Sequence, residues 1–393
     1  MMINYMKVKP ADRTISVQEY YFSTKLRQIE MMRKEGADVI NLGIGSPDMS
    51  PSENTLTKLV SEALKPNVHG YQSYNGTPTL RSAFAVWYAK YFNVTLNPDN
   101  EILPLMGSKE GIMHISMAFV NPGDEVLIPD PGYPAYASVT NLVGGIVRYY
   151  SLEEENGWLP DLEELEASDL SKVKLMWVNY PHMPTGTKGS PELFEYLISF
   201  ATDHNILICN DNPYSFILNN EYNSILSTEN AREVALELNS LSKSHNMAGW
   251  RIGMVAGNKE YINEILKVKS NMDSGMFLPL QAAAAEALNN PETWYGSINK
   301  VYRKRRKIAE GIMKAIGCKY NPEQVGLFLW GRLPENIQSC ENLIDELLLK
   351  AHLFITPGFI FGKNGERYIR ISLCSDEETL LRAKERVLRL FKK

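Results

Sequence analysis

Seven short apolar segments between residues 101 and 257 constrain the fold of this chain more than any other feature. They cover residues 101–107, 125–131, 145–152, 173–181, 205–213, 233–241 and 251–257. Several are apolar throughout, whereas a strand with one solvated face alternates apolar and polar residues. Between them, residues 191–204 predict an amphipathic helix with Ser190 as its N-cap. The pattern predicts a mostly parallel sheet that helices cover on both faces.

The two ends of the chain differ from this middle part. Residues 16–36 predict a helix, and the C-terminal part combines charged helices, such as 340–351, with short strands, such as 368–374. A chain of 393 residues is long enough for two domains. We therefore predict an α/β fold with a three-layer large domain over residues 50–290. The remaining residues, 1–49 and 291–393, are expected to form a smaller α+β domain.

Composition and charge argue against several classes of function. The net charge of −5 lacks the basic excess that binders of nucleic acid or of anionic membrane surfaces usually show. The four cysteines are widely scattered, so we expect no disulfide framework, no zinc site and a reducing compartment. The first residues lack an apolar core of signal-peptide length, and no segment approaches the length of a membrane span. These features predict a cytoplasmic protein.

Polar and charged residues follow the predicted strands, at the edge where open parallel sheets bind ligands. Residues 107–109 open a helix whose free N–H groups attract phosphate, although Ser108 could equally be a simple N-cap. Asp211 closes a strand as either a turn residue or a buried carboxylate with a cationic partner. Lys243 follows another strand, and a lone lysine is usually solvated. Each position alone is a weak signal.

Together, however, these groups are those that a pyridoxal phosphate pocket needs. A lysine forms the Schiff base with the cofactor, and its pKa must be lowered for that purpose. An aspartate pairs with the pyridinium nitrogen, so that the ring can act as an electron sink. Arg251, serine hydroxyls and the N–H groups of a helix start can bind the phosphate. The set therefore predicts a pyridoxal 5'-phosphate site.

Eight segments carry a resemblance to a known family. They read NLGIGSPD, YQSYNGTPTLRSAFAVWY, GSKEGI, NPGDEVLIPDPGYPAY, NYPHMPTG, DNPY, SLSKSHNMAGWRIG and YIRISL. In this order and spacing the chain resembles, over nearly its whole length, the class I/II aminotransferases of the fold-type I pyridoxal phosphate superfamily. The segments QEYYFSTKLRQI and KSNMDSGMF resemble the branch that holds diaminopimelate, methionine and broad-specificity aminotransferases.

The resemblance implies an aminotransferase that moves an α-amino group from an L-amino acid to a 2-oxo acid by a ping-pong mechanism. Lys243 would form the Schiff base and shuttle the proton between the substrate Cα and C4′ of the cofactor. Asp211 would pair with the pyridine nitrogen, and Tyr214 would donate to the phenolic oxygen. Other residues match the family's cofactor contacts, namely Ser108, Lys109 through its backbone N–H, Tyr133 stacked on the ring, Ser240, Ser242 and Arg251.

The resemblance also implies the substrate contacts and the assembly. Arg370 would clamp the substrate α-carboxylate with a bidentate fork, and Gly43 lies in the loop that lines the substrate side. Tyr71 matches a tyrosine that reaches the phosphate of the neighbouring subunit. A homodimer with shared active sites is therefore expected.

One position departs from the family's pattern. The motif usually reads Asn-Pro-Thr-Gly, and its Asn donates to the phenolic oxygen of the cofactor, whereas Met183 takes that place here. Methionine cannot donate a hydrogen bond to the phenolate. The pKa of the Schiff base is therefore expected to be higher than in relatives with Asn. Asn179 lies too far upstream to be the obvious replacement.

Several alternatives remain open at this stage. A β-C–S lyase, a decarboxylase or a synthase on the same scaffold would share these cofactor residues. A cofactor-binding regulator would need an appended DNA-binding domain, for which the chain has no spare segment. No metal ligand stands out, and His114 is expected to pack on the apolar face of its helix.

The substrate is less constrained than the cofactor. No second arginine is evident that would clamp a side-chain carboxylate. The segments EYYF and SGMFLPL add aromatic and apolar surface. The sequence therefore favours neutral, aromatic or sulfur-containing amino acids.

Overall fold

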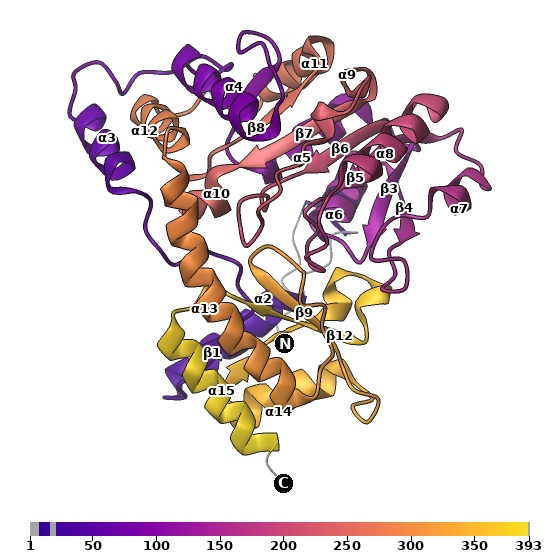
Figure 1. The fold of residues 1–393 in the computed structure, drawn as a ribbon. Helices are drawn as coiled ribbons and strands as arrows, with labels where there is room; N and C mark the ends of the chain where they lie inside the picture. The colour runs from indigo at the N-terminus through magenta and orange to yellow at the C-terminus, as the bar shows by residue number, and fades with distance from the viewer. Residues whose placement is uncertain (1–7, 16–20, 392–393) are drawn as a thin grey trace.

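A seven-stranded sheet forms the centre of the upper part of the molecule in the computed structural model, which describes residues 8–15 and 21–391 (Figure 1). Its strand order is β2-β8-β7-β6-β5-β3-β4. All pairings are parallel except those of β8 with β2 and β7. The strands are β2 (Ile102–Leu105), β3 (Glu125–Asp130), β4 (Ile146–Ser151), β5 (Val173–Val178), β6 (Leu207–Asp211), β7 (Ala235–Ser240) and β8 (Gly253–Gly257). The predicted α/β fold with a mostly parallel sheet is confirmed.

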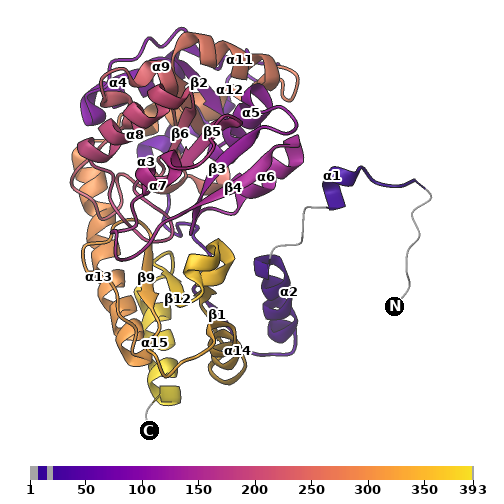
Figure 2. The same cartoon turned by 90° about the vertical axis from the view of Figure 1, so that its right-hand side faces the viewer.

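Helices cover both faces of this sheet, as Figure 2 shows. One face carries α5 (Ser108–Phe119), α6 (Ala135–Val143) and α11 (Lys259–Lys269), and the other carries α4 (Pro78–Phe92), α8 (Pro191–His204) and α12 (Leu278–Leu288). Helix α8 begins and ends as predicted, because the Ser190 hydroxyl accepts a hydrogen bond from Leu193 N and the left-handed Asn205 terminates it. Burial on both faces explains why several of the inner strands are apolar throughout.

The lower part of the molecule combines segments from both ends of the chain. Strands β11 (Thr356–Pro357), β12 (Tyr368–Ser372) and β9 (Phe328–Arg332) form an antiparallel sheet, and β1 (Ile40–Asn41) pairs in parallel with β10 (Leu353–Phe354). The surrounding helices are α2 (Tyr21–Lys34), α13 (Glu292–Ile316), α14 (Cys340–Ala351) and α15 (Glu377–Phe391). Of the helix predicted over 16–36, residues 16–20 lie outside the described residues.

Shorter elements connect these layers. They are α1 (Asp12–Ile15), α3 (Glu53–Ala63), α7 (Leu162–Glu166), α9 (Ala231–Val234), α10 (Leu241–Ser244), η1 (Ile225–Ser227), η2 (Ala248–Trp250), η3 (Gly358–Phe361) and η4 (Lys363–Gly365). Among the residues that the structure describes, no helix is both long enough and apolar enough to cross a membrane.

A buried carboxylate ties the middle strands of the sheet to their covering elements. Glu237 on β7 accepts hydrogen bonds from Tyr88 Oη at 2.8 Å, Asn210 Nδ2 at 2.9 Å and Ser224 Oγ at 2.8 Å. These donors satisfy a group that would otherwise be costly to bury. The network holds β6 and β7 side by side, and the two strands deliver Asp211 and the segment around Lys243 to the same edge of the sheet.

Candidate active site

A single cavity of about 590 Å³ lies at the edge of the sheet where the parallel strands end. Its wall combines residues of the large sheet with residues of the lower part, which include Phe328 and Phe361. Every candidate site residue except Tyr71 lines it: Gly43, Ser108, Lys109, Tyr133, Met183, Asp211, Tyr214, Ser240, Ser242, Lys243, Arg251 and Arg370. Tyr71 is 93% exposed and lies outside this cavity.

One end of the cavity is built for an anion. Gly107 precedes α5 with a φ of +85°, and a Cβ at this position would lie 2.2 Å from Nη2 of Arg251. Only a glycine therefore lets the guanidinium approach the start of α5 this closely. Ser108 is the first residue of the helix and not its N-cap, and its buried hydroxyl has no hydrogen-bond partner among the described residues. The helix start, a free hydroxyl and Arg251 together suit a phosphate group.

The two serines near Lys243 have a local role as well. Ser240 is the N-cap of the short helix α10, and its hydroxyl accepts a hydrogen bond from Ser242 N at 3.0 Å. This cap fixes the turn that carries Lys243 out of β7.

Asp211 ends β6 as a buried charge and not as a solvated turn residue. Its Oδ2 accepts a hydrogen bond from Tyr136 Oη at 3.0 Å, while its buried Oδ1 has no partner among the described residues. Burial raises the pKa of Asp211 to about 7, against the opposing effects of the Tyr136 hydrogen bond and the Lys243 charge. An unpaired, buried carboxylate oxygen suits a protonated ring nitrogen, which would donate to it and hold the carboxyl ionised.

Lys243 is partly buried and is not a solvated surface charge. Its Nζ donates to the carbonyl oxygen of Gly45 at 2.5 Å. Burial lowers the pKa of Lys243, because an ammonium loses hydration in the cavity. A lowered pKa is the property that a nucleophilic lysine requires.

Arg370 is fixed between two aromatic rings. Its guanidinium carbon lies 3.9 Å from the ring centre of Phe328 and 4.6 Å from that of Phe361. Nη2 donates to the carbonyl oxygen of Gly43 at 2.9 Å, and Nη1 lies 3.2 Å from Sδ of Met183. Burial lowers its pKa to about 10, so the guanidinium stays charged at neutral pH. Its Nε has no partner among the described residues, which leaves a donor for an incoming carboxylate.

Sequence reasoning missed several residues of the cavity. Tyr136, which bonds Asp211, is the second tyrosine of PGYPAY and stacks on Trp177 at 5.0 Å. Asn179 donates to the backbone oxygen of Asp211 and accepts a hydrogen bond from Met183 N at 2.9 Å. The Asn179 side chain therefore bonds the backbone in both contacts. In neither contact does it take the place of the Asn that Met183 replaces in the family motif. The spacing of the motifs offers no signal for such contacts, because they depend on how the loops fold over the strands.

The donor set therefore fits pyridoxal phosphate. The cavity contains a buried carboxylate oxygen that has no partner among the described residues, a partly buried lysine and an anion cradle at a helix start. This combination on a helix-covered, mostly parallel sheet defines a fold-type I pyridoxal-phosphate-dependent enzyme.

Comparison with known proteins identifies the family within this class. The family model for aminotransferase class I and II matches residues 37–387, and the chain belongs to that family. It is therefore an aminotransferase that uses pyridoxal phosphate, and the alternative lyase function is not favoured.

Individual relatives agree over the whole length. The chain is 39% identical to the LL-diaminopimelate aminotransferase of Natranaerobius thermophilus, covering 98% of this chain and 100% of the relative. It is 42% identical to that of Aquifex aeolicus, covering 97% and 98%. Among solved structures, substrate-bound BacF of Bacillus subtilis matches with a TM-score of 0.93 and 33% identity, covering 98% of each chain. A mutant aspartate aminotransferase of Thermus thermophilus matches with a TM-score of 0.90 and 26% identity, covering 98% and 100%.

The raised pKa of Asp211 predicts a pH dependence of stability in the cofactor-free protein. Because the folded state binds this proton more tightly than the unfolded state does, the stabilisation is complete below about pH 4 and is lost as the pH rises through about 7. The loss is on the order of 4 kcal/mol. Asp211→Asn removes it, so the variant should gain stability relative to wild type as the pH rises from 4 to 7 in thermal and urea unfolding. Asp99→Asn, at an exposed aspartate, should track wild type. A constant difference between Asp211→Asn and wild type over this range would contradict the assignment.

Proposed function

We propose that Lys243 is the residue that binds the cofactor covalently and carries the substrate's α-proton. Its burial and lowered pKa support a nucleophilic amine. The bound cofactor supplies an electron sink for the charge that develops at the substrate α-carbon. Lys243 Nζ would take the proton from this carbon as a general base.

The other candidate residues are proposed to bind and orient. Asp211 would hold a proton on the ring nitrogen through its unpaired Oδ1. Ser108, Ser240, Ser242, Arg251 and the backbone N–H of Lys109 would bind the phosphate, with Tyr133 packed on the ring and Tyr214 donating to the phenolic oxygen. Arg370 would bind the substrate α-carboxylate, because Phe328 and Phe361 hold its guanidinium in one plane and Gly43 anchors one end of the fork.

The amino donor is proposed to carry a neutral, aromatic or sulfur-containing side chain. Apolar and aromatic side chains form much of the cavity wall, including Phe22, Phe359 and Ile360. Arg251 lies at the anion cradle beside Gly107, so it is not free for a second carboxylate. A charged distal group would therefore lack an arginine partner among the described residues that line the cavity.

A second candidate donor is LL-diaminopimelate. The relatives from Natranaerobius thermophilus and Aquifex aeolicus are named LL-diaminopimelate aminotransferases. The distal end of LL-diaminopimelate is a charged amino acid group. The two candidates therefore make opposite predictions about whether this cavity accepts a donor with a charged distal group.

A half-reaction without an oxo acid tests both candidates and the chemistry. Purified holoenzyme is mixed in turn with phenylalanine, methionine, leucine, glutamate and LL-diaminopimelate. We expect the neutral donors to yield one equivalent of oxo acid per site and then to stop, until a 2-oxo acid restores turnover. Lys243→Ala should abolish turnover and keep the circular dichroism of the folded protein, whereas Lys267→Ala, on the surface, should match wild type. Efficient reaction of LL-diaminopimelate alone would favour the second candidate, and sustained release of ammonia would contradict transamination.

Met183 is proposed to raise the pKa at which the absorbance of the bound cofactor changes. Its thioether faces Arg370 and cannot donate a hydrogen bond to the phenolic oxygen. Met183→Asn should lower that pKa by about 1 to 2 units, because a hydrogen bond to a charged oxygen stabilises it. Met183→Leu, which also lacks a donor, should keep the wild-type value. A spectrophotometric pH titration of the three holoenzymes measures the effect, and equal pKa values for wild type and Met183→Asn would refute it.

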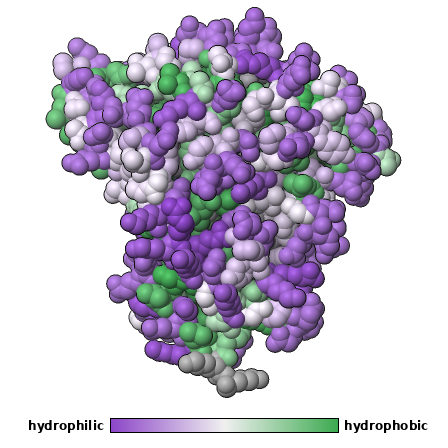
Figure 3. All heavy atoms as spheres, viewed as in Figure 1, coloured by the Kyte–Doolittle hydropathy of each residue, from purple (hydrophilic) through white to green (hydrophobic). Residues whose placement is uncertain are grey.

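A homodimer with shared sites is proposed from the exposed surface around Tyr71. Large apolar side chains stay exposed nearby in sequence, including Val60 at 60% and Leu64 at 81%. Figure 3 shows hydrophobic side chains at the left edge of the molecule, where α3 lies in Figure 1. Tyr71 does not line its own chain's cavity, so its proposed place is the phosphate end of the partner's site.

Mixing two inactive variants tests this arrangement. Lys243→Ala and Tyr71→Ala are each expected to be nearly inactive. After dissociation and random reassociation, half of the dimers are hybrids with one intact site, so about a quarter of wild-type activity should return. No recovery in a mixture that light scattering shows to be dimeric would place Tyr71 outside the partner's site.

Two domains are proposed for the chain. Residues 50–290 are proposed as the large pyridoxal phosphate domain, and residues 1–49 with 291–393 as the small domain. Arg370 Nη2 bonds the carbonyl oxygen of Gly43, so the proposed substrate side joins both ends of the chain. The four cysteines are free and buried, which supports the proposed cytoplasmic location.

A further inference from the structure

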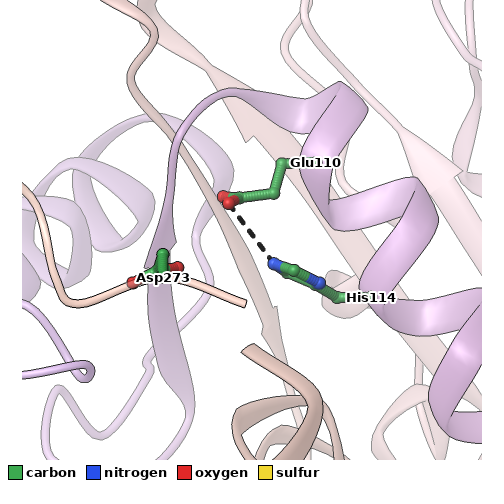
Figure 4. A group of neighbouring side chains, drawn as sticks. All are labelled: Glu110, His114 and Asp273. Carbon is green, nitrogen blue, oxygen red and sulfur yellow. Dashed lines mark ion pairs between the residues drawn. The ribbon is translucent and has the colours of Figure 1, made fainter. Parts of the chain in front are cut away.

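A second cluster of ionisable side chains lies on α5, apart from the cavity. Glu110 and His114 lie one turn apart on this helix, and Asp273 joins them from the segment that follows α11. Figure 4 shows the Glu110 carboxylate and the His114 ring turned toward each other, with Asp273 close by. One ligand atom from each of the three lies within 4.8 Å of the others.

His114 lacks the partners that a buried histidine usually has. The residue is 1% exposed, and neither ring nitrogen makes a hydrogen bond to the described residues. The nearest charged group is Oε1 of Glu110, at 3.4 Å from Nε2. Leaving a buried polar atom unsatisfied is costly, so such a group indicates a missing partner.

The carboxylates of Glu110 and Asp273 lie beside the His114 ring and can accept further contacts. Oε2 of Glu110 accepts the backbone N–H of Met106 at 2.5 Å, which leaves Oε1 facing His114. Asp273 accepts Gly275 N at 2.8 Å on Oδ1, and Lys269 Nζ contacts both of its oxygens, at 2.8 and 2.7 Å. With a neutral imidazole, two carboxylates face one ammonium, so one negative charge is uncompensated within this group.

We propose that Glu110, His114 and Asp273 form a binding site for a divalent first-row transition-metal cation. Two ligands of a tetrahedral Zn²⁺ ion lie about 3.4 Å apart, because each bond is about 2.1 Å long. His114 Nε2 and Glu110 Oε1 already have this separation. Two ligands four positions apart on one helix, with a third ligand from another segment, are a recurrent arrangement in zinc sites.

Lys269 competes with the cation for Asp273. Its ammonium is fully buried and shares both oxygens of this carboxylate, so metal binding requires Asp273 to release at least one of them. Lys269 therefore lowers the affinity of the site for a cation. A bound cation would join α5, which begins at the anion cradle, to the segment after α11.

The mixed nitrogen and oxygen ligands determine which metal ion is best used to test the site. One imidazole and two carboxylates suit Zn²⁺ and Co²⁺ better than Mg²⁺ or Ca²⁺, which prefer oxygen ligands alone. Co²⁺ absorbs in the visible range at wavelengths longer than those of the bound cofactor, so its binding can be followed in the holoenzyme.

The experiment titrates untagged holoenzyme, free of unbound cofactor, with Co²⁺ and then displaces it with Zn²⁺. We expect one equivalent per chain, a tetrahedral Co²⁺ spectrum and an increase in the melting temperature. His114→Ala should weaken binding on the order of 100-fold, because it removes the nitrogen ligand. Lys269→Met should tighten binding by about tenfold or more, because it frees Asp273 and removes a like charge.

Controls separate this site from adventitious binding. His204→Ala removes a histidine that pairs with a single glutamate, Glu166, near the surface and should bind Co²⁺ as wild type does. Asp273→Asn replaces His114→Ala as the ligand variant if the latter does not fold. The proposal is overturned if wild type and Lys269→Met both bind less than one equivalent. It is equally overturned if the ligand variants retain wild-type affinity, or if His204→Ala alone loses it.

Discussion

The burial of three charged side chains in one largely apolar cavity is the constraint on which the rest of this structure depends. Lys243, Asp211 and Arg370 would each be more stable in water as isolated ions. They stay in the cavity because the surrounding loops give each one a partial set of partners. Within the described part of the chain, one atom of Asp211 and one of Arg370 have no partner. The same desolvation shifts the pKa values of all three toward their neutral forms. The charged cofactor and the zwitterionic substrate proposed for this cavity would supply the missing partners.

The parallel sheet provides the rigid frame for these charges. β6 and β7 end side by side, so Asp211 and the turn that carries Lys243 reach the same edge without long excursions of the backbone. Glu237 anchors this pair of strands from within, through hydrogen bonds to three side chains. The lower part of the molecule closes the cavity from the other side with Gly43, Gly45 and Arg370, which come from segments more than 300 residues apart.

Sequence patterns predicted the strands well, because burial on both faces leaves a plain signal of continuous apolar runs. They also predicted that Ser108, Asp211 and Lys243 gather at one edge of the sheet, since residues that end neighbouring parallel strands must lie close together. The family resemblance added Gly43, Tyr133 and Arg370, which line the same cavity. The contacts of Tyr136 and Asn179 with Asp211 were not predicted, because they depend on loop conformations that leave no periodic pattern in the sequence. His114 was expected to pack against apolar neighbours. It is indeed buried, but it faces Glu110 and Asp273, and the latter is remote from it in sequence.

By itself the sequence determined the α/β class, the order of the strands along the chain, the family and most of the polar groups that line the cavity. These follow from local patterns and from motifs whose residues act near one another in the chain. Only the tertiary structure decided which atoms of Asp211, Ser108 and Arg370 lack a partner among residues 8–15 and 21–391, and that Gly107 leaves room for Arg251. It also decided that Met183 contacts the guanidinium of Arg370. Such facts depend on distances between segments far apart in sequence, which burial and backbone geometry set only once the whole chain has folded.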